Sequence, residues 1–597
     1  MKYIQRTSKN ITEDFLKELL LDRGIITEDE DYQERFFNPT KDNLEDYKLL
    51  DNIEKGADLL EKHIKKGSKI YLIVDSDIDG FTSSAVLYNY ITEYYRDKYD
   101  YEIEYHIPDG KEHGLDTLMK SLENEKLYDL IICPDSSSND YEAHEKLASM
   151  GYEILVQDHH EASHYSEHAV VINNQLSKNY PNKDLSGVGV VYKFLQLLDE
   201  RNGWNGADDY LDLVATGMCG DMMKMTTHEN RYIANYGFSH LRNEGLRQLV
   251  KYQCYSIFGL AAADITEEYL DNAIITPINV SFYIAPLVNA LIRVGALSEK
   301  ELLFKSFICG KQEIPSTKRG HKGEYETIAE QSARNCANAR NRQNKEKEKA
   351  TELLDIQISN DCLDDNKILI LNADEIDVSN TLTGLCAMNV AAKYKKPVLL
   401  GRATPDGQYL KGSMRGQNGS ELKDFRTFLL DSGYMDYVEG HNNAAGFSIK
   451  ISDISKLTDY ANTKLANINF NEGFYEADFV VNANCSYLTQ MIFDLWGGRR
   501  IYGQDCDEPV IVVENLTLSP QNIQVIGSNK DTLKITFNNM IYMKFKAKSL
   551  IEKISQQTGK FSATIVGRGN VNTWMGNQTA QIFMDDIEIN EFDMNMF

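Results

Sequence analysis

Residues 69–80 are Lys-Ile-Tyr-Leu-Ile-Val-Asp-Ser-Asp-Ile-Asp-Gly, a short apolar and β-branched run that leads directly into three alternating carboxylates. The run predicts a buried strand, and the apolar spacing from about 82 to 95 predicts a helix after it. Further strand candidates lie at 130–133 and 152–156. Because helical segments separate these short strands, the sequence predicts an α/β fold with a parallel, doubly wound sheet.

A second α/β stretch follows from about 366 to 470. Strand candidates at 368–371 and 397–400 flank an apolar-periodic segment at 382–394, which predicts a helix between them. Before this stretch, residues 331–350 carry six Lys or Arg against two Glu and predict one long polar helix. That helix is either a solvated connection between the two α/β parts or a strip that faces nucleic acid.

The tail from 480 to 597 changes to short alternating runs at 510–513, 533–537 and 563–566, with turn residues between them. This pattern predicts a small β-barrel. The first 64 residues are charged and carry apolar positions at helical spacing, which predicts a helical lead-in.

The composition bounds the class of protein. The 597 residues are 42% hydrophobic and 26% charged, which excludes a disordered or fibrous chain. The 63 basic and 90 acidic residues give a net charge of −27, which argues against a general basic coat for nucleic acid but leaves room for a local basic groove. No apolar run of 18 residues occurs, residues 1–6 lack the apolar stretch expected of a secretory signal, and the nine cysteines form no C-x-x-C pair. We therefore expect a cytoplasmic protein with reduced thiols and no membrane span.

The strongest chemical signal is the alternation of Asp75, Asp77 and Asp79 directly after the first strand. Crowded carboxylates repel one another and raise their pKa values unless cations neutralise them. A solvated acidic turn is the simpler alternative. A calcium-binding EF-hand loop is excluded, because its twelfth position requires Glu and is Val86 here.

Three more polar clusters lie at the ends of apolar runs: Asp135, then Asp158-His159-His160, then Asp221. Each alone could be a helix cap or a surface group. Together they supply Asp and His ligands without thiolates, which suits Mn²⁺ or Mg²⁺ better than structural zinc. The ligands suffice for two ions about 3.5–4 Å apart, an arrangement used in phosphoryl displacement. No G-x-x-x-x-G-K-[ST] loop occurs, so nucleotide-driven motor chemistry has no support.

These four clusters resemble the motifs of the DHH phosphoesterase superfamily, and most closely those of the RecJ-type single-strand-specific 5′→3′ exonucleases. The resemblance implies that Asp77 and Asp135 bind one metal ion. It implies a second metal ion bound by Asp79, Asp135, His159 and Asp221, with Asp135 bridging the two. It further implies a catalytic set in which Asp75 is a ligand or supports one, Asp158 belongs to the DHH motif, and His160 contacts the scissile phosphate.

The resemblance covers essentially the whole chain. Residues 439–447 resemble the G-G-H-x-x-A-A-G-F signature of the DHHA1 domain, 412–415 its substrate-phosphate element, and 286–295 the P-R-x-N-A-A-G-R-x-G segment. Residues 502–510 and 574–576 resemble parts of an OB-fold. The implied substrate-binding residues are His160, Asn289, Arg293, Ser413, Arg415 and His441.

Two departures from the family pattern put substrate affinity and length preference in question. Leu287 replaces the arginine after Pro286, and Glu439 replaces the first glycine of G-G-H. An acid near a substrate phosphate would oppose binding unless its side chain faces away.

The implied architecture has two α/β domains, DHH and DHHA1, which a long helix joins, and a C-terminal OB-like β-barrel. The expected parts are a helical lead-in at 1–64, a DHH domain at 65–240, a helical region at 241–357, a DHHA1 domain at 358–475 and the barrel at 476–597. Substrate is expected in a cleft between the two α/β domains.

The implied function is the metal-dependent hydrolysis of single-stranded DNA from its 5′ end to 5′-mononucleotides, with two Mn²⁺ or Mg²⁺ ions. The expected protein is a monomer whose partner is single-stranded DNA, with a single-strand-binding protein or a helicase as further candidates. DNA repair and recombination are the processes that this implies. Two alternatives stay open: a DHH phosphodiesterase acting on short oligonucleotides or cyclic dinucleotides, and a non-catalytic replication scaffold with the same fold.

Overall fold

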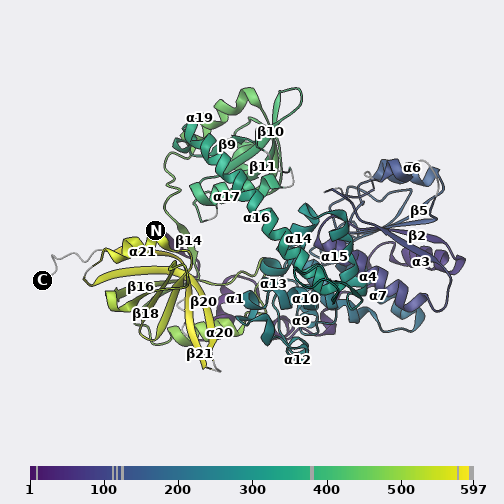
Figure 1. Cartoon of the computed structure of the whole chain (residues 1–597), viewed down its shortest axis with the longest axis horizontal. Coiled ribbons are helices and arrows are strands. Elements are labelled where there is room, and N and C mark those ends of the chain that lie inside the picture. The colour runs from purple at the N-terminus through teal and green to yellow at the C-terminus, as the bar shows by residue number, and fades with distance from the viewer. Residues whose placement is uncertain are drawn as a thin grey trace. The chain divides into compact units, whose positions relative to one another are not determined.

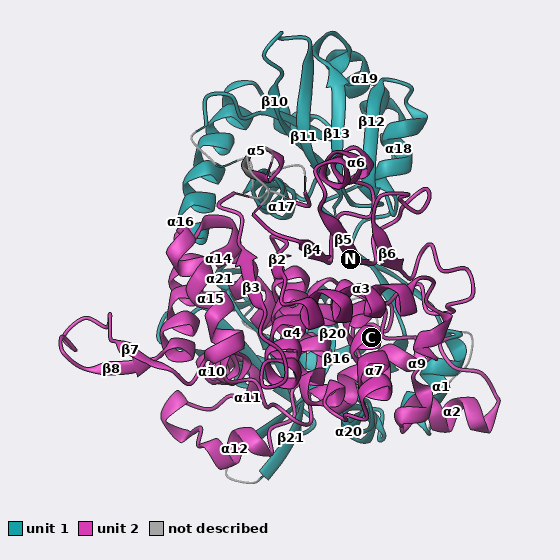
Figure 2. Cartoon of the chain, turned by 90° about the vertical axis from the view of Figure 1, so that its right-hand side faces the viewer, with its two compact units in different colours: residues 1–24, 343–498, 508–597 teal, residues 25–342, 499–507 magenta. Residues whose placement is uncertain are grey.

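The fold is described from a computed structural model of the chain (Figure 1). It describes residues 1–590 except 8–10, 12, 111–112, 116–117, 123–126, 377–378, 380–381, 418, 558 and 575–576. The chain forms two compact units (Figure 2). Unit 1 comprises residues 1–24, 343–498 and 508–597, and unit 2 comprises 25–342 and 499–507. The five-part division expected from the sequence stays a prediction.

Unit 2 contains a five-stranded parallel sheet in the order β3-β2-β4-β5-β6. Its strands are β2 (Lys69–Ile73), β3 (Glu102–His106), β4 (Leu130–Pro134), β5 (Glu153–Asp158) and β6 (Val170–Asn173). The three predicted strands are among them. The chain leaves β2 toward β3 and then returns to β4 on the other side, so the carboxyl ends of β2 and β4 meet at a switch point. Open α/β sheets bind ligands at such points.

Helices cover both faces of this sheet, which confirms the predicted doubly wound arrangement. Helices α3 (Ile53–Lys66), α4 (Ile78–Tyr95) and α7 (Gly187–Asn202) pack on one face. Helix α6 (Tyr141–Ser149) packs on the other, against alternate side chains of β4 and β5. The packing is close: a Cβ atom added at Gly56 of α3 would lie 2.7 Å from a β6 side chain.

The rest of unit 2 is largely helical. Three of its helices pack on α4: α8 (Leu211–Gly220), α14 (Ala285–Val294) and α15 (Leu297–Cys309). Helix α9 (His228–Gly237) packs on α8, and α10 (Glu244–Tyr252) packs on α15. Among the described residues, one helical stretch, Pro277–Val294, is long and apolar enough to cross a membrane. Half of it is buried inside the protein, and core helices pass the same test. The expectation of no membrane partner stays a prediction.

Helix α16 (Ile328–Asn360) confirms the predicted long helix and extends it to 33 residues. Its early turns are not simply solvated, because Ala333, Cys336 and Ala339 are buried. The helix begins in unit 2 and continues into unit 1.

Unit 1 contains a second five-stranded sheet, in the order β12-β13-β11-β10-β9, with α17 (Thr383–Tyr394) packed on it. The pair β9–β10 is parallel and the other pairs are antiparallel. The strands are β9 (Leu369–Asn372), β10 (Val398–Ala403), β11 (Tyr409–Arg415), β12 (Met435–His441) and β13 (Ala444–Lys450).

The tail of unit 1 forms a seven-stranded sheet in the order β15-β16-β20-β21-β19-β18-β17, in which the three predicted strands lie. Its strands are β15 (Phe479–Asn482), β16 (Val510–Leu518), β17 (Ile523–Ile526), β18 (Thr532–Phe537), β19 (Met540–Lys544), β20 (Phe561–Trp574) and β21 (Asn577–Asn590). The resemblance at 574–576 falls partly outside the described residues.

The first residues differ from the helical lead-in that the sequence predicts. Lys2–Gln5 forms β1, which pairs in parallel with β14 (Phe474–Ala477). Helix α1 (Phe15–Asp22) then packs against α20 (Leu488–Gly497). Residues 1–24 therefore belong to unit 1, because their pairing and packing partners lie in the last quarter of the chain.

The segment 499–507 overlaps the stretch whose sequence resembles part of an OB-fold. It belongs to unit 2, where the Met225 N–H donates to the carbonyl of Gln504 at 2.9 Å. The guanidinium of Arg231 donates to the carbonyl of Ile501 at 3.5 Å and stacks on Phe36 at 4.0 Å. This segment therefore makes hydrogen bonds at and just before helix α9 in unit 2.

Candidate metal centre

The first acidic motif lies in the turn between β2 and α4. Asp77 is the N-cap of α4, and its Oδ1 accepts a hydrogen bond from the Gly80 N–H at 3.0 Å. Asp75 is 3% exposed and lies against Gly80, where an added Cβ would come within 2.5 Å of the Asp75 Cβ. Glycine at this position therefore allows the carboxylates to lie close together.

Asp79 is fully buried and points toward the first turn of α7. Its carboxylate accepts hydrogen bonds from the Gly187 N–H at 2.7 Å and the Val188 N–H at 3.3 Å. Unsatisfied N–H groups at a helix N-terminus favour negative charge, so this helix stabilises Asp79 as a carboxylate.

Asp135 follows β4 with a left-handed backbone, at φ +64°. Its side chain is 1% exposed, and no hydrogen-bond donor among the described residues satisfies Oδ1. A Cβ at Gly187 would lie 2.3 Å from this oxygen. A buried carboxylate oxygen without a donor indicates a place where a cation would fit.

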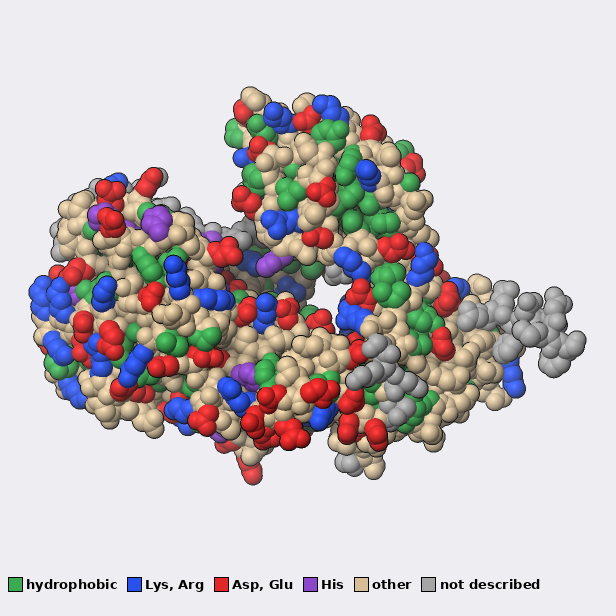
Figure 3. Space-filling model, turned by 180° about the vertical axis from the view of Figure 1, so that it is seen from behind, with side chains coloured by type: hydrophobic (Ala, Val, Ile, Leu, Met, Phe, Trp, Pro, Cys, Tyr) green, Lys and Arg blue, Asp and Glu red, His purple; other side chains and the backbone are tan. Residues whose placement is uncertain are grey.

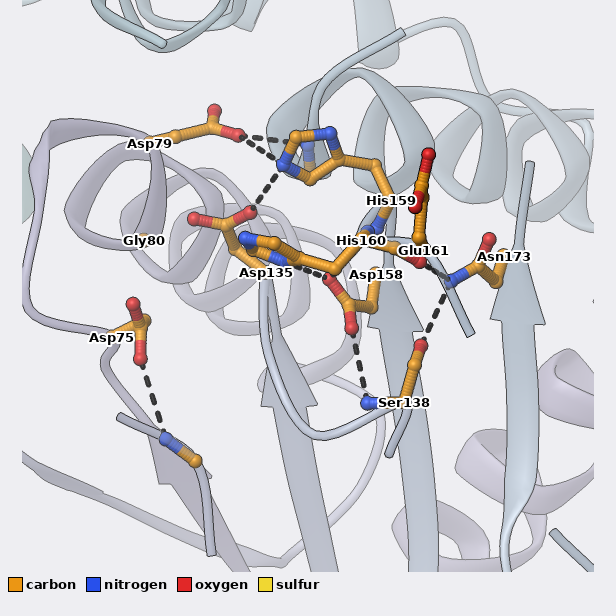
Figure 4. Close-up of polar contacts among 12 residues, drawn as sticks. Asp75, Asp79, Gly80, Asp135, Ser138, Asp158, His159, His160, Glu161 and Asn173 are labelled. Atoms are coloured by element: carbon orange, nitrogen blue, oxygen red, sulfur yellow. Dashed lines mark hydrogen bonds and ion pairs between the residues drawn. The ribbon is translucent and has the colours of Figure 1, made fainter. Parts of the chain in front are cut away.

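His159 lies between the acids, as Figure 4 shows. Its Nε2 is 3.3 Å from Asp135 Oδ1, 3.3 Å from Asp221 Oδ2 and 4.0 Å from Asp79 Oδ2. Burial and the neighbouring His160 lower the pKa of His159 to about 4. The ring is therefore neutral at pH 7, the state in which imidazole binds metals.

His160 forms a separate imidazole–carboxylate pair with Asp158 (Figure 4). Its Nδ1 donates to Asp158 Oδ1 at 2.7 Å, and the same carboxylate accepts from the Ser138 N–H at 3.0 Å. Asp158 is 1% exposed whereas the His160 side chain is 57% exposed. The hydrogen bond to Asp158 raises the pKa of His160 to about 9, so the exposed ring is cationic near neutral pH.

The charges of the cluster are unfavourable without a cation. Burial and the nearby carboxylates Asp79 and Asp77 raise the pKa of Asp221 to about 8. Burial and Asp77 likewise raise the pKa of Asp79 to about 7, and the pKa of Asp135 is raised well above its ordinary value by burial and Asp79. A divalent cation would reverse this preference and hold the carboxylates ionised.

The side chains form three overlapping groups whose ligand atoms lie within 4.8 Å of one another. They are Asp75 with Asp77 and Asp135, Asp79 with His159 and Asp221, and Asp135 with His159 and His160. The structure thus brings together the acids and imidazoles of the four motifs. Oxygen ligands with one or two imidazoles suit Mn²⁺ or Mg²⁺.

One member of the site, His113, carries no signal in the sequence. Its Nδ1 donates to Asp75 Oδ2 at 2.8 Å, and the Gly114 N–H donates to Asp75 Oδ1 at 3.4 Å. Because His113 follows β3 and Asp75 follows β2, only the parallel pairing of these strands brings the two side chains together.

Two of the predicted substrate-binding residues lie beside the first acidic motif. Asn289 of α14 accepts a hydrogen bond from the Ile78 N–H through Oδ1 at 3.1 Å. Burial lowers the pKa of Arg293, one helical turn later, and the carboxylate of Asp77 opposes that shift. Asn289 therefore supports the start of α4, and Arg293 supplies positive charge near Asp77.

Besides these two and His160, the three remaining residues, Ser413, Arg415 and His441, lie in unit 1 and share one face of its sheet. Arg415 pairs with Ala444, and Ala444 pairs with His441, so these paired residues form one row across β11, β13 and β12. Ser413 precedes Arg415 by two residues and so lies on the same face. Gly384 in the first turn of α17 lies over them, since an added Cβ would be 2.4 Å from an Arg415 nitrogen and 3.4 Å from Ser413 Oγ.

Glu439 does not face away from this row. It pairs with Gly446, which pairs with Ser413, and directly paired residues of antiparallel strands point to the same face. The Glu439 side chain is exposed. The acid that departs from the family pattern thus shares the face of Ser413 and Arg415.

Two family profiles match the chain. The profile of the DHH family, N-terminal domain, matches residues 69–218, and the profile of the RecJ OB domain matches residues 481–586. The first contains three of the four motifs, and the second contains most of the seven-stranded sheet of unit 1.

Similar proteins match along almost the whole chain. The "Putative SPbeta prophage-derived single-strand DNA-specific exonuclease YorK" of Bacillus subtilis (strain 168) is 36% identical over 583 residues, 96% of each chain. The single-stranded-DNA-specific exonuclease RecJ of the same organism is 25% identical over 593 residues, which cover 96% of this chain and 68% of that protein.

Among solved structures, RecJ from Thermus thermophilus in complex with Mn²⁺ matches with a TM-score of 0.67 and 19% identity, over 96% of this chain and 75% of that chain. The same protein in complex with Mg²⁺ matches with a TM-score of 0.62 and 18% identity, over 98% of this chain and 78% of that chain. At these identities the likeness concerns the fold.

Proposed function

We propose, from the premise that this chain belongs to the RecJ-type branch of the DHH family, that it is a metal-dependent exonuclease that degrades single-stranded DNA from the 5′ end. The observation that carries the proposal is the convergence of three carboxylates on one neutral imidazole, that of His159, at the switch point of the sheet. The names of the similar proteins from Bacillus subtilis support single-stranded DNA as the substrate.

Two divalent ions, Mn²⁺ or Mg²⁺, fit the donor groups. Asp77 and Asp135 would hold one, with Asp75 beside it, and Asp79, Asp135, His159 and Asp221 would hold the other. Such a pair lowers the pKa of a bound water and neutralises charge on the oxygens of a phosphodiester.

The chain's own side chains would orient the phosphate. Cationic His160 would donate to a non-bridging oxygen, while Asp158 fixes its ring on the other side. Arg293 would add positive charge beside Asp77. Neutral His159 offers Nε2 as a ligand.

Recognition of a 5′ end would rest on the row in unit 1. Arg415 suits bidentate contact with a terminal phosphate, and Ser413 and His441 share its sheet face. We further propose that the protein acts as a cytoplasmic monomer, with a single-strand-binding protein or a helicase as partner.

The test is an assay on 5′- and 3′-labelled single and double strands with Mn²⁺, Mg²⁺ or a chelator. We expect 5′-mononucleotides from single strands with metal, and no product with the chelator. Preferential cleavage of a dinucleotide or cyclic dinucleotide would favour the phosphodiesterase alternative. Calorimetry that detects no Mn²⁺ binding would favour the non-catalytic scaffold.

A further inference from the structure

The stretch Pro277–Val294 carries a stripe of partly exposed side chains along one side. Phe282, Pro286, Asn289 and Arg293 recur at intervals of four, three and four residues, the spacing of one helix face. The residues between them are mostly buried. The stripe is therefore the side of this stretch that is turned away from the core of unit 2.

Contacts place the stripe beside the candidate metal centre. At its later end, Asn289 accepts from the Ile78 N–H, and Arg293 lies in the field of the Asp77 carboxylate. At its earlier end, the Ser281 hydroxyl donates to the Cys219 carbonyl at 2.9 Å, two residues before Asp221. The stretch that carries the stripe thus runs from the Asp77 side of the centre to the last turn of α8, which Asp221 follows.

The earlier end of the stripe exposes large apolar side chains. Phe282 is 62% exposed and Tyr283 is 37% exposed, within a π-helical segment, Val280–Ile284. Such segments are frequent at functional sites. Met222 is 47% exposed and has a left-handed backbone, at φ +58°, directly after Asp221. These exposed aromatic and thioether groups do not contribute to the core.

We propose that Phe282, with Tyr283 beside it, is a stacking platform for a nucleobase of the strand whose phosphate lies at the metal centre. The proposal rests on the proposed function and names the part of the substrate that this surface takes. Aromatic rings bind single strands because every base has a π-face. Stacking also supplies affinity to a chain of net charge −27 that cannot rely on long-range attraction.

The helix rise places the platform relative to the cleaved bond. Phe282 precedes Asn289 by seven residues, about 10 Å along a helix axis. The stacked base therefore belongs to a nucleotide next to the cleaved one, and the platform bears on strand binding more than on the chemical step.

The experiment compares Phe282→Ala, Phe282→Trp and the control Tyr255→Ala in the full chain. Tyr255 is 78% exposed and lies on α11 (Cys254–Phe258), so it matches Phe282 as an exposed aromatic. On a labelled single strand we expect Phe282→Ala to raise KM on the order of tenfold with kcat within about twofold. Phe282→Trp should restore KM, and Tyr255→Ala should leave both constants unchanged.

A strand series with one abasic site at each position identifies the stacked base. Binding is measured by anisotropy in an Asp135→Asn background, which does not require cleavage. We expect an abasic site at one position of the strand to weaken its binding, on the order of tenfold, to the protein that keeps Phe282. The same abasic site should not change binding to the protein that also carries Phe282→Ala.

Equal abasic profiles with and without the Phe282 ring would overturn the platform, whether or not the wild-type chain cleaves. A position-specific abasic effect that needs the ring, together with a wild-type chain that fails to cleave, would support the platform and overturn the nuclease proposal alone.

Discussion

Asp135 shows at the scale of one residue how the backbone serves the candidate chemistry. A non-glycine residue at φ +64° is uncommon, and such strain persists where the surroundings enforce it. Here the left-handed turn directs the carboxylate at His159, and Gly187 leaves the space that Oδ1 occupies. The strained backbone and the crowded charge together indicate a site selected for binding rather than for stability.

Asp135→Asn tests that interpretation. Asparagine tolerates the left-handed backbone and removes a carboxylate from a crowded, buried site, so the metal-free variant should have a higher free energy of unfolding than the wild type. Mn²⁺-dependent cleavage should fall on the order of 1,000-fold or more. Denaturant unfolding with chelator and a cleavage assay measure the two effects. Near-normal turnover, or a less stable metal-free variant, would contradict the assignment.

The sequence predicted the residues of the centre because most of them follow a strand closely, whereas Asp221 directly follows helix α8. Asp79, Asp135 and His159 lie at successive strand ends or in the turn after one, and parallel strands bring these ends together. His113 could not be predicted, because no spacing rule connects it to Asp75 in another strand's loop. The exposed stripe on Pro277–Val294 likewise needed the contacts of the fold.

At the scale of elements, short apolar runs in the sequence were the reliable predictor of β-strands. The strands β2, β4, β9 and β16 were all predicted from such runs. Strand β1 was missed because its four residues are mostly exposed and form no apolar run. Its partner β14 lies in the last quarter of the chain, and local patterns carry no information on such pairing.

The ion pair between Glu326 of β8 (Tyr325–Thr327) and Arg334 of α16 gives a pH-dependent prediction. Arg334 holds the pKa of buried Glu326 at about 2, below its ordinary 4.5, through two hydrogen bonds of 2.5 and 2.7 Å. A depressed carboxyl pKa stabilises the folded state above pH 4.5, and this stabilisation is lost as pH falls toward 2.

Glu326→Gln should therefore lower the free energy of unfolding of unit 2 by about 2–3 kcal/mol at pH 7. The difference from wild type should shrink between about pH 5 and pH 3. Urea midpoints across this range measure it. The control Glu324→Gln, on an acid whose side chain is 64% exposed, should change little at any pH. A pH-independent difference would show that packing rather than charge is responsible.

The position of Glu439 on the sheet face shared by β11, β13 and β12 predicts that removing its charge increases affinity for a strand with a 5′ phosphate. Because Glu439 and Ser413 face the same side, Glu439→Gln should bind a 5′-phosphorylated strand about fivefold tighter. Binding of a 5′-hydroxyl strand should change less. Asp436→Asn, also on β12, is the control for loss of a charge. An equal gain on both strands would show that Glu439 does not sense the terminal phosphate.

At the scale of the molecule, the charge is strongly acidic and spread out. On the face that Figure 3 shows, Asp and Glu side chains are interspersed with Lys and Arg. Single-strand affinity should thus depend weakly on salt, with a slope of log K against log salt of about −2 to −4, as three to five phosphate contacts give. Titrations between about 50 and 300 mM salt, in about twofold steps, measure this slope. A slope near −10 would indicate an extended basic groove instead.

Contacts divide the chain into two units with interleaved segments, and the division into five sequential parts stays a prediction. Sequence patterns find elements, but they do not show that residues 1–24 join unit 1 or that residues 499–507 join unit 2. Those memberships depend on contacts between residues hundreds of positions apart.

The pairing of β1 with β14 has a consequence for biosynthesis. Lys2 leaves the ribosome 472 residues before its partner Phe474 (474 − 2). At translation rates of roughly 5–20 residues per second, that interval lasts about 25–95 seconds. Most of unit 2 is translated within it, while the apolar side chains of Phe15 and Leu19 have no partner from the end of the chain. A nascent chain of this protein is thus expected to depend on a chaperone at its beginning long after its middle has folded.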